Sequence, residues 1–285
     1  MMKQAQKTNP KQISIRGIIH DKSPKLAKWI PRFLINYLRK ITHEDLVNEL
    51  IRDYGHLEGF DFSEAMIKFF NVSIDVEGED NLPKDGKYIF VSNHPLGGFD
   101  GHILMYLIGK LYGENKYKFL VNDILMNLTN MKDVFIPVNK HGRQGVELAK
   151  QIDDAYESDV QILTFPAGLV SRRIKGLITD LQWQKSFISK AKQYKRNVIP
   201  IHISGRNTEF FYRLGSLRKK LGIKANIEML YLIDETYRHK NKQFVVKFGK
   251  PIAWQTFDNS KRPAAWAKWV KDIVYKMDGV DNVPL

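Results

Sequence analysis

The chain has 285 residues with 43% hydrophobic content and no cysteine. One main domain with a substantial core is therefore expected, and disulfides and cysteine metal ligands are excluded. The formal net charge of +14 indicates an anionic partner, such as nucleic acid, a lipid surface or an acidic carrier protein. The first residues lack the apolar segment of a secretory signal, and no run reaches the roughly 18 apolar residues that span a bilayer, so we expect a protein of the cytoplasmic side.

The first 40 residues form a basic amphipathic segment. They contain ten Lys or Arg and one acid, Asp21. An apolar stripe recurs there at helical spacing, and Pro31 should kink or split the helix; the stripe consists of Leu26, Trp29, Ile30, Phe33, Leu34, Tyr37 and Leu38. Two interpretations remain open. The stripe packs on the protein's own core, or its residues 29–37 enter a membrane whose anionic head groups meet the cations.

A second helical region is expected near residues 43–70, and beyond it short β-rich runs alternate with helical ones. The runs are 87–92, 117–121, 134–138, 160–165, 198–203, 227–233 and 244–248, and the helices are 101–112, 143–156, 184–194, 207–220 and 263–277. This alternation predicts an α/β fold with a central, mostly parallel or mixed sheet of about seven strands flanked by helices. We expect residues 1–75 to be a membrane-associating helical region and residues 76–285 to be the α/β domain.

Reactive side chains in such a sheet tend to follow the carboxyl ends of strands. The first strong run leads directly into His94-Pro-Leu-Gly-Gly-Phe-Asp100. A histidine becomes a useful base near neutral pH when a carboxylate fixes its tautomer, and Gly97 and Gly98 allow the tight return that such a pair needs. His102 has no carboxylate at zinc-site spacing, so no metal site is expected.

Three further segments follow apolar strands. They are TFPAGLVSRR at residues 164–173, VFIPVNK at 134–140 and VIPIHI at 198–203. In the first, Gly168 permits close backbone approach, and Arg172 and Arg173 are suited to binding an anionic group. Each segment alone has the pattern of a buried strand and its turn.

Taken in order, these four segments resemble the four sequence blocks of the lysophospholipid acyltransferase superfamily. The resemblance covers about residues 85–205, and SNHPLGGFDG together with FPAGLVSRR is closest to the bacterial branch that O-acylates lyso-ornithine and lyso-glycine aminolipids. It implies that His94 deprotonates the acceptor hydroxyl and that Asp100 orients His94. It also implies acyl transfer without a covalent enzyme intermediate, with acyl-carrier protein or acyl-CoA as co-substrate and no other cofactor.

The same resemblance suggests the remaining site residues. The Gly168 N–H is the expected oxyanion donor, and Arg172, Arg173 and Lys185 are the expected partners of an anionic head group. The chain departs from the family pattern at three points: the His-to-Asp interval is one residue longer, Ala167 replaces the usual Glu, and Asn139 and Lys140 stand where an Arg often meets the acceptor phosphate. These departures favour an aminolipid acceptor over lysophosphatidic acid.

The expected partners are thus a lysolipid, an anionic membrane surface and an acyl-carrier protein, with the protein peripheral on the cytoplasmic face of the cell membrane. Basic residues at 185–196 and 213–220 are a candidate docking surface for the acidic carrier. Three alternatives stay open: a 1-acylglycerol-3-phosphate acyltransferase of phospholipid synthesis, a catalytically silent lipid-binding relative, and a nucleic-acid-binding protein, although no nucleic-acid-binding module is recognisable.

Overall fold

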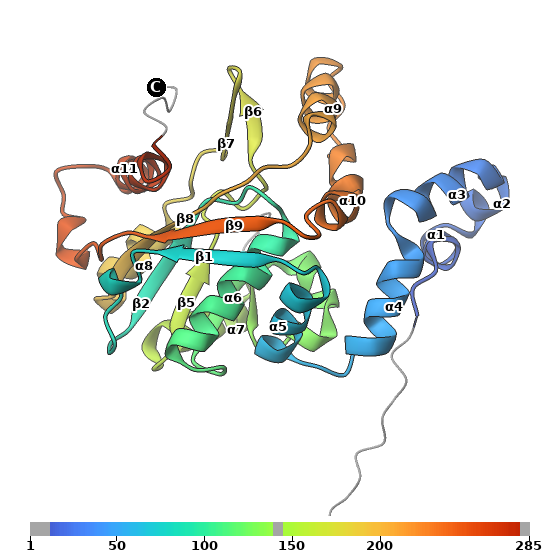
Figure 1. The fold of residues 1–285 in the computed structure, drawn as a ribbon. Coiled ribbons are helices and arrows are strands. Elements are labelled where there is room, and N and C mark those ends of the chain that lie inside the picture. Colours follow the sequence, from blue (N-terminus) through green and yellow to red (C-terminus); the bar gives the residue numbers. More distant parts are fainter. Residues whose placement is uncertain (1–11, 139–144, 280–285) are drawn as a thin grey trace, which may run out of the picture.

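A computed structural model describes residues 12–138 and 145–279 of the chain. Its centre is a seven-stranded sheet with the order β1-β9-β8-β2-β5-β3-β4 (Figure 1). All neighbouring strands are parallel except β8 and β9, so the predicted α/β fold with a mostly parallel sheet is confirmed. The strands are β1 (Ser73–Glu77), β2 (Tyr88–Ser92), β3 (Tyr117–Asn122), β4 (Phe135–Val138), β5 (Gln161–Thr164), β8 (Asn197–Ile203) and β9 (Gln243–Phe248).

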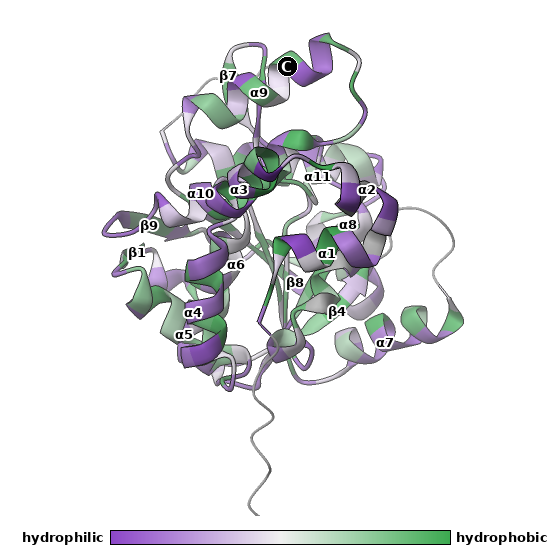
Figure 2. Ribbon diagram, turned by 90° about the vertical axis from the view of Figure 1, so that its right-hand side faces the viewer, coloured by the Kyte–Doolittle hydropathy of each residue, from purple (hydrophilic) through white to green (hydrophobic). Residues whose placement is uncertain are grey.

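Helices cover both faces of the sheet (Figure 2). One face is packed by α5 (Gly59–Phe69) and α6 (Gly98–Tyr112), and the other by α7 (Val146–Glu157), α8 (Ser186–Tyr194) and α11 (Pro263–Lys276). Because both faces are covered, the central strand β2 is buried at all five of its positions, as parallel sheets require. The catalytic-loop candidate therefore starts from a strand that is buried along its whole length.

A second layer lies over the carboxyl ends of the strands. It consists of the hairpin β6 (Arg172–Ile174) and β7 (Leu177–Thr179), the helices α9 (Glu209–Lys220) and α10 (Leu232–Tyr237), and the 3-10 helix η4 (Ile227–Tyr231) between them. Lys175 and Gly176 both have positive φ, at 48° and 87°, which gives the two-residue turn of a tight hairpin. Further 3-10 turns are η1 (Glu79–Asn81), η2 (Asp123–Asn127), η3 (Thr129–Met131) and η5 (Trp254–Thr256).

The N-terminal helices form an arm that projects beside this layer (Figure 1). They are α1 (Ile15–Lys22), α2 (Pro24–Trp29), α3 (Arg32–Ile41) and α4 (Glu44–Tyr54). The predicted break at Pro31 is confirmed, because it separates α2 from α3. Trp29 is 85% and Phe33 75% exposed, while Leu34 and Tyr37 are exposed to a smaller degree and Ile30 is half-buried. Most of the predicted stripe therefore does not pack on the core of the protein.

Two predictions about elements were wrong. Residues 227–233 form η4 and the start of α10 rather than a strand, because Glu228 in this run is fully buried and pairs with two arginines. The seventh strand is instead β1, an edge strand that the sequence pattern did not single out. None of the helices in the described part of the chain has the length and apolar content needed to cross a membrane.

Candidate active site

The loop that follows β2 is fixed at its first residue by a side chain. Asn93 is buried, and its amide donates to the Ile203 carbonyl oxygen at 2.9 Å and accepts from the Ile203 N–H at 2.7 Å. A buried amide that satisfies both groups of a neighbouring strand end ties the two strand termini together. His94 thus leaves the sheet in a defined direction.

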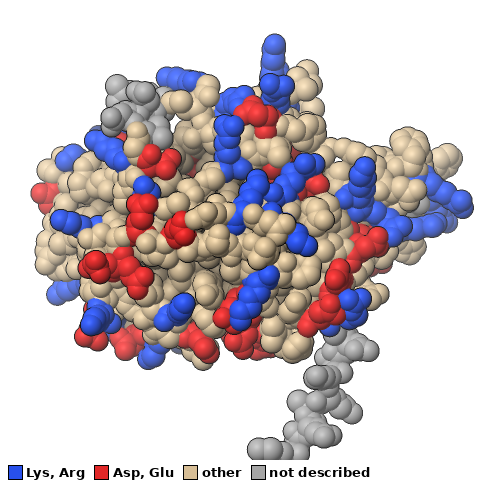
Figure 3. Space-filling model, viewed as in Figure 1, with Lys and Arg blue, Asp and Glu red and all other residues tan. Residues whose placement is uncertain are grey.

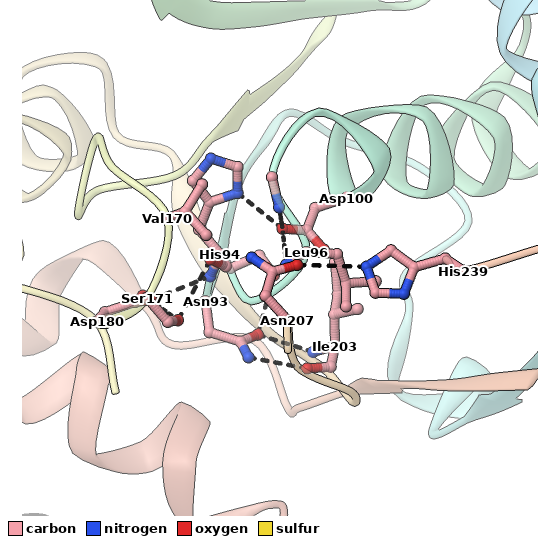
Figure 4. A network of polar contacts seen from close by, with 12 residues as sticks. Asn93, His94, Leu96, Asp100, Val170, Ser171, Asp180, Ile203, Asn207 and His239 are labelled. Atoms are coloured by element: carbon pink, nitrogen blue, oxygen red, sulfur yellow. Dashed lines mark hydrogen bonds and ion pairs between the residues drawn. The ribbon is translucent and has the colours of Figure 1, made fainter. Parts of the chain in front are cut away.

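His94 and Asp100 meet as predicted (Figure 4). The Nδ1 atom of His94 lies 2.8 Å from Oδ2 of Asp100, whose side chain is fully buried, whereas the His94 side chain is 15% exposed. Oδ2 also accepts from the Leu96 N–H at 2.9 Å and the Gly97 N–H at 3.1 Å. An acceptor at Nδ1 selects the tautomer with the proton there, which leaves the lone pair of Nε2 for the substrate.

The environment of Asp100 acts on its pKa in two directions. Burial raises the pKa of Asp100, and the hydrogen bonds from His94 and from the Leu96 backbone oppose that rise. The donors around Oδ2 stabilise the charged carboxylate, because a carboxylate that accepts several N–H bonds keeps its charge more easily. This arrangement suits a group that must stabilise an imidazolium next to it.

The loop between His94 and Asp100 turns at Gly97. Its φ of 86° lies in the left-handed region, and α6 begins at the next residue, so Asp100 stands in the first turn of that helix. A Cβ atom at Gly97 would come within 3.1 Å of Leu232 in α10. The backbone conformation therefore favours glycine here, and the close neighbour leaves little room for a side chain.

The third block supports the histidine directly. The ring of Phe165, just after β5, stacks on the His94 imidazole with 4.1 Å between ring centroids and an angle of 12° between planes. The Ser171 N–H donates to the His94 carbonyl oxygen at 2.8 Å. The stacked ring holds the imidazole plane, and the Ser171 hydrogen bond holds the loop backbone.

Asp180 is a positioning residue that the sequence analysis missed. Its buried carboxylate accepts from the His94 N–H at 3.2 Å, the Ser171 hydroxyl at 2.6 Å and the Trp183 indole N–H at 2.9 Å. The Lys271 ammonium donates to its backbone carbonyl oxygen at 2.6 Å. No local pattern could reveal this role, because Asp180 lies 86 residues from His94 and outside the four blocks.

Gly168, the predicted oxyanion donor, and Arg172, a predicted head-group partner, already bond other groups of the protein. The Gly168 N–H donates to the Phe165 carbonyl oxygen at 2.9 Å, so it closes a turn instead of pointing at a substrate. Arg172 is 7% exposed, donates to the Val170 carbonyl oxygen at 2.8 Å and pairs with Glu228, and burial lowers the pKa of Arg172. These residues brace the layer above the sheet.

The other predicted head-group residues have different positions. Arg173 grips Glu209 with Nη2 at 2.7 and 2.8 Å from the two carboxylate oxygens. Lys185 is exposed, makes no ion pair with any described residue, and follows Gln184, whose N–H donates to the Pro166 carbonyl oxygen at 2.9 Å. Among the cations predicted to bind the head group, Lys185 therefore combines a position beside the third block with an exposed side chain. Asn139 and Lys140 lie outside the described residues.

Cavities of about 440, 560 and 360 Å³ lie away from the His94–Asp100 pair. The first is an apolar hollow between β1 and the later turns of α6, the second adjoins the end of α6, and the third lies in the N-terminal arm. Within residues 12–138 and 145–279, no three His, Asp or Glu side chains are grouped in a way that could hold a metal ion. The chemistry that the site itself supports is proton transfer by His94.

Three comparisons with known proteins found similar sequences and structures. A family model described as Acyltransferase matches residues 17–278. A lyso-glycine lipid O-acyltransferase of Bacteroides thetaiotaomicron is 50% identical over 265 residues, which are 93% of this chain and 97% of that protein. A protein of the same name from Phocaeicola vulgatus is 48% identical over 265 residues, with 93% and 95% covered. A crystal structure of the 1-acyl-sn-glycerophosphate acyltransferase from Thermotoga maritima matches with 15% identity and a TM-score of 0.48, over 94% of this chain and 89% of that one.

Proposed function

The chain belongs to the acyltransferase family, and from this premise we propose that it esterifies the free hydroxyl of a lyso-glycine lipid with a fatty acyl group. Two relatives with about half of their residues identical to this chain carry that activity in their names, and the matches cover nearly the full length of both partners. The observation that carries the proposal is the His94–Asp100 pair at the carboxyl edge of the sheet, at 2.8 Å.

The first step uses Nε2 of His94 as general base. It takes the proton of the acceptor hydroxyl while the oxygen attacks the carbonyl carbon of the acyl thioester, and the C–O bond forms. Asp100 stabilises the resulting imidazolium through the bond at Nδ1. Phe165 and Asp180 keep the imidazole in place during this step, because one stacks on the ring and the other holds the His94 N–H.

The second step releases the thiol of the carrier. The tetrahedral intermediate collapses, the C–S bond breaks, and the imidazolium returns its proton from Nε2 to the thiolate sulfur. The histidine is neutral again, and no acyl group has been attached to the protein. We propose acyl-carrier protein as the donor, because the net charge of +14 complements an acidic carrier, and acyl-CoA as the other possible co-substrate.

For the acceptor head group, Lys185 is the proposed partner. The glycine carboxylate is a compact anion that a single ammonium can pair with, and Lys185 is exposed beside residues 166–168. Arg172 and Arg173 are not assigned to this role, since each already pairs with a glutamate.

We further propose that the protein is peripheral on the anionic cytoplasmic face of the cell membrane. Trp29 and Phe33 on the arm are largely exposed. The arm cavity of about 360 Å³ is lined by Arg16, Arg32 and Arg39 with one acid, Glu44, and its charge suits a lipid phosphate. An apolar ridge beside a basic hollow is the surface expected of an interfacial amphipathic segment.

The activity test measures acyl transfer from acyl-carrier protein and from acyl-CoA to lyso-glycine lipid, lyso-ornithine lipid and lysophosphatidic acid. We expect turnover with lyso-glycine lipid, and loss of at least about a thousandfold in His94→Ala. The matched control is His102→Gln in α6, the helix whose first turn carries Asp100, because the His102 imidazole bonds Ser63 and lies outside the pair. Preference for lysophosphatidic acid would refute the acceptor, and full activity of His94→Ala would refute the mechanism.

A further inference from the structure

Helix α9 has two apolar faces, and its core contacts use one of them. The inner face buries Phe211 and Tyr212 against Val170. The outer face carries a stripe at i, i+4, i+7 and i+11, formed by Phe210, Leu214, Leu217 and Leu221, which are 52% exposed, half-buried, 53% exposed and 64% exposed. A stripe of this spacing is the pattern of a helix face that packs against something.

The outer stripe continues beyond the helix. Ile223 in the following loop is 39% exposed, and Leu230 in η4 is 51% exposed. We call the whole set the α9 patch: Phe210, Leu214, Leu217, Leu221, Ile223 and Leu230. Scattered exposed apolar residues need no explanation, whereas six on adjoining elements mark an interaction surface.

Cations lie beside the α9 patch, and Figure 3 shows basic side chains gathered over α9. Lys219, Lys220 and Lys224 are exposed and form no ion pair with described residues, and Arg213 shares Glu209 with two other arginines. Leucines set among lysines are the composition of a surface that enters an anionic bilayer at the level of its head groups. A protein partner bound through charge alone would not require the exposed leucines.

The α9 patch is connected both to the catalytic loop and to the arm. Leu232 of α10 packs against Gly97, and Arg218 of α9 pairs with Glu228, which also holds Arg172. On the arm side, the Tyr37 and Tyr231 hydroxyls are hydrogen-bonded, and His43 lies 2.8 Å from the Asp234 carboxylate. The ring of Phe210 contacts that of Tyr231, so the two apolar surfaces adjoin through these tyrosines.

We infer that the α9 patch is a second lipid-contacting surface, and that the arm and the patch together seat the catalytic loop against an anionic bilayer. The inference rests on the proposed membrane association of the arm and extends it to an element of the α/β domain. In this arrangement the elements that pack on the His94 loop contact the lipid head groups. A lysolipid therefore needs to rise only partly out of the bilayer for its hydroxyl to reach His94. The occupant is the bilayer surface and not the acyl-carrier protein, so of the two basic segments predicted to dock the carrier, 213–220 is assigned here to lipid and 185–196 is left for the carrier.

The test measures binding of the full chain to vesicles of phosphatidylcholine mixed with phosphatidylglycerol. Leu217→Gln with Leu221→Gln should weaken partitioning by roughly tenfold for each leucine, since an inserted leucine gains about that factor. Val146→Gln is the control, because Val146 is 89% exposed on α7, away from α9 (Figure 2). Substituting Gln for the four arm residues Trp29, Phe33, Leu34 and Tyr37, in addition to the two leucines, should weaken vesicle binding further.

Kinetics separate this inference from the proposed reaction. The double variant should lose activity on vesicle-borne acceptor while it retains activity on acceptor dispersed in detergent and retains the KM for acyl-carrier protein. Unchanged vesicle binding overturns the inference, and so does a higher KM for the carrier or a change in oligomeric mass, which would reveal a protein partner instead. Absence of turnover in wild type with every acceptor refutes the proposed reaction and leaves the vesicle result interpretable.

Discussion

Replacing Asp180 by Asn tests whether a buried carboxylate outside the His94–Asp100 pair positions the catalytic loop. The carboxylate accepts three hydrogen bonds, from the His94 N–H, the Ser171 hydroxyl and the Trp183 indole N–H. An amide offers one oxygen and one donor group, so one N–H must lose its acceptor. The Ser171 hydroxyl can rotate and accept from the new amide, whereas the two N–H groups cannot.

The choice between the two N–H groups is set by distance. The Trp183 bond, at 2.9 Å, is shorter than the His94 bond, at 3.2 Å, so the amide oxygen should keep the indole and its NH₂ should face the His94 N–H. An unsatisfied buried N–H and the loss of charge together cost about 3 kcal/mol of folding free energy. Displacement of the loop should lower kcat by roughly ten- to a hundredfold with little change in KM.

A second substitution makes this reasoning refutable. Trp183→Phe removes the competing donor, so in the double variant the amide oxygen is free to turn to His94 and kcat should recover at least in part. Stability is measured by urea unfolding. The kcat is measured under conditions well below the unfolding midpoint of every variant. If Asp180→Asn keeps wild-type kcat, or if Trp183→Phe alone loses as much kcat as Asp180→Asn and gives no recovery, then Asp180 does not act on the loop.

Three further outcomes follow from described contacts. Asn93→Ala leaves the buried N–H and C=O of Ile203 without partners and should lower the free energy of unfolding by about 3 kcal/mol in urea titration. Arg172→Met leaves Glu228 with one arginine instead of two; it should destabilise by about 3 kcal/mol in the same assay, while the KM for the acceptor stays unchanged. Burial lowers the pKa of His239 from 6.5 to about 4 in the folded protein. As the pH falls from 6.5 to about 4, His239 therefore becomes protonated in the unfolded chain before it does so in the folded protein, and the free energy of unfolding decreases. His239→Gln should remove up to about 3 kcal/mol of that acid-induced loss, measured by unfolding at neutral and acidic pH.

The sequence predicted the parts of the fold that local pattern controls. Six of the seven sheet strands were placed within a residue or two, because buried parallel strands are continuous apolar runs between turns. The strand predicted at 227–233 failed because tertiary contacts decide its conformation: Glu228 is buried by Arg172 and Arg218, which come from separate elements. The edge strand β1 was missed because it is short and half polar.

The same division holds for the site. His94 and Asp100 are six residues apart, so their pairing follows from the loop alone and could be predicted. Asp180 bonds His94 from 86 residues away, and Arg172 pairs with Glu228, 56 residues downstream. The roles of both residues therefore depend on which elements pack together. For the arm, sequence left core packing and membrane contact open, and the exposure of Trp29 and Phe33 shows that these two rings are not part of the core.

The pairing of β1 with β9 has a consequence for biosynthesis. Ser73 lies opposite Gln243, and β9 is also the partner that closes the edge of β8. The entropy of loop closure must be overcome before such distant contacts form. β1 emerges early from the ribosome, but it cannot pair with β9 until nearly the whole polypeptide has been translated. During that interval the nascent chain exposes an unprotected β8 edge, so chaperone engagement should be concentrated there, and chains terminated before residue 243 should be prone to aggregate.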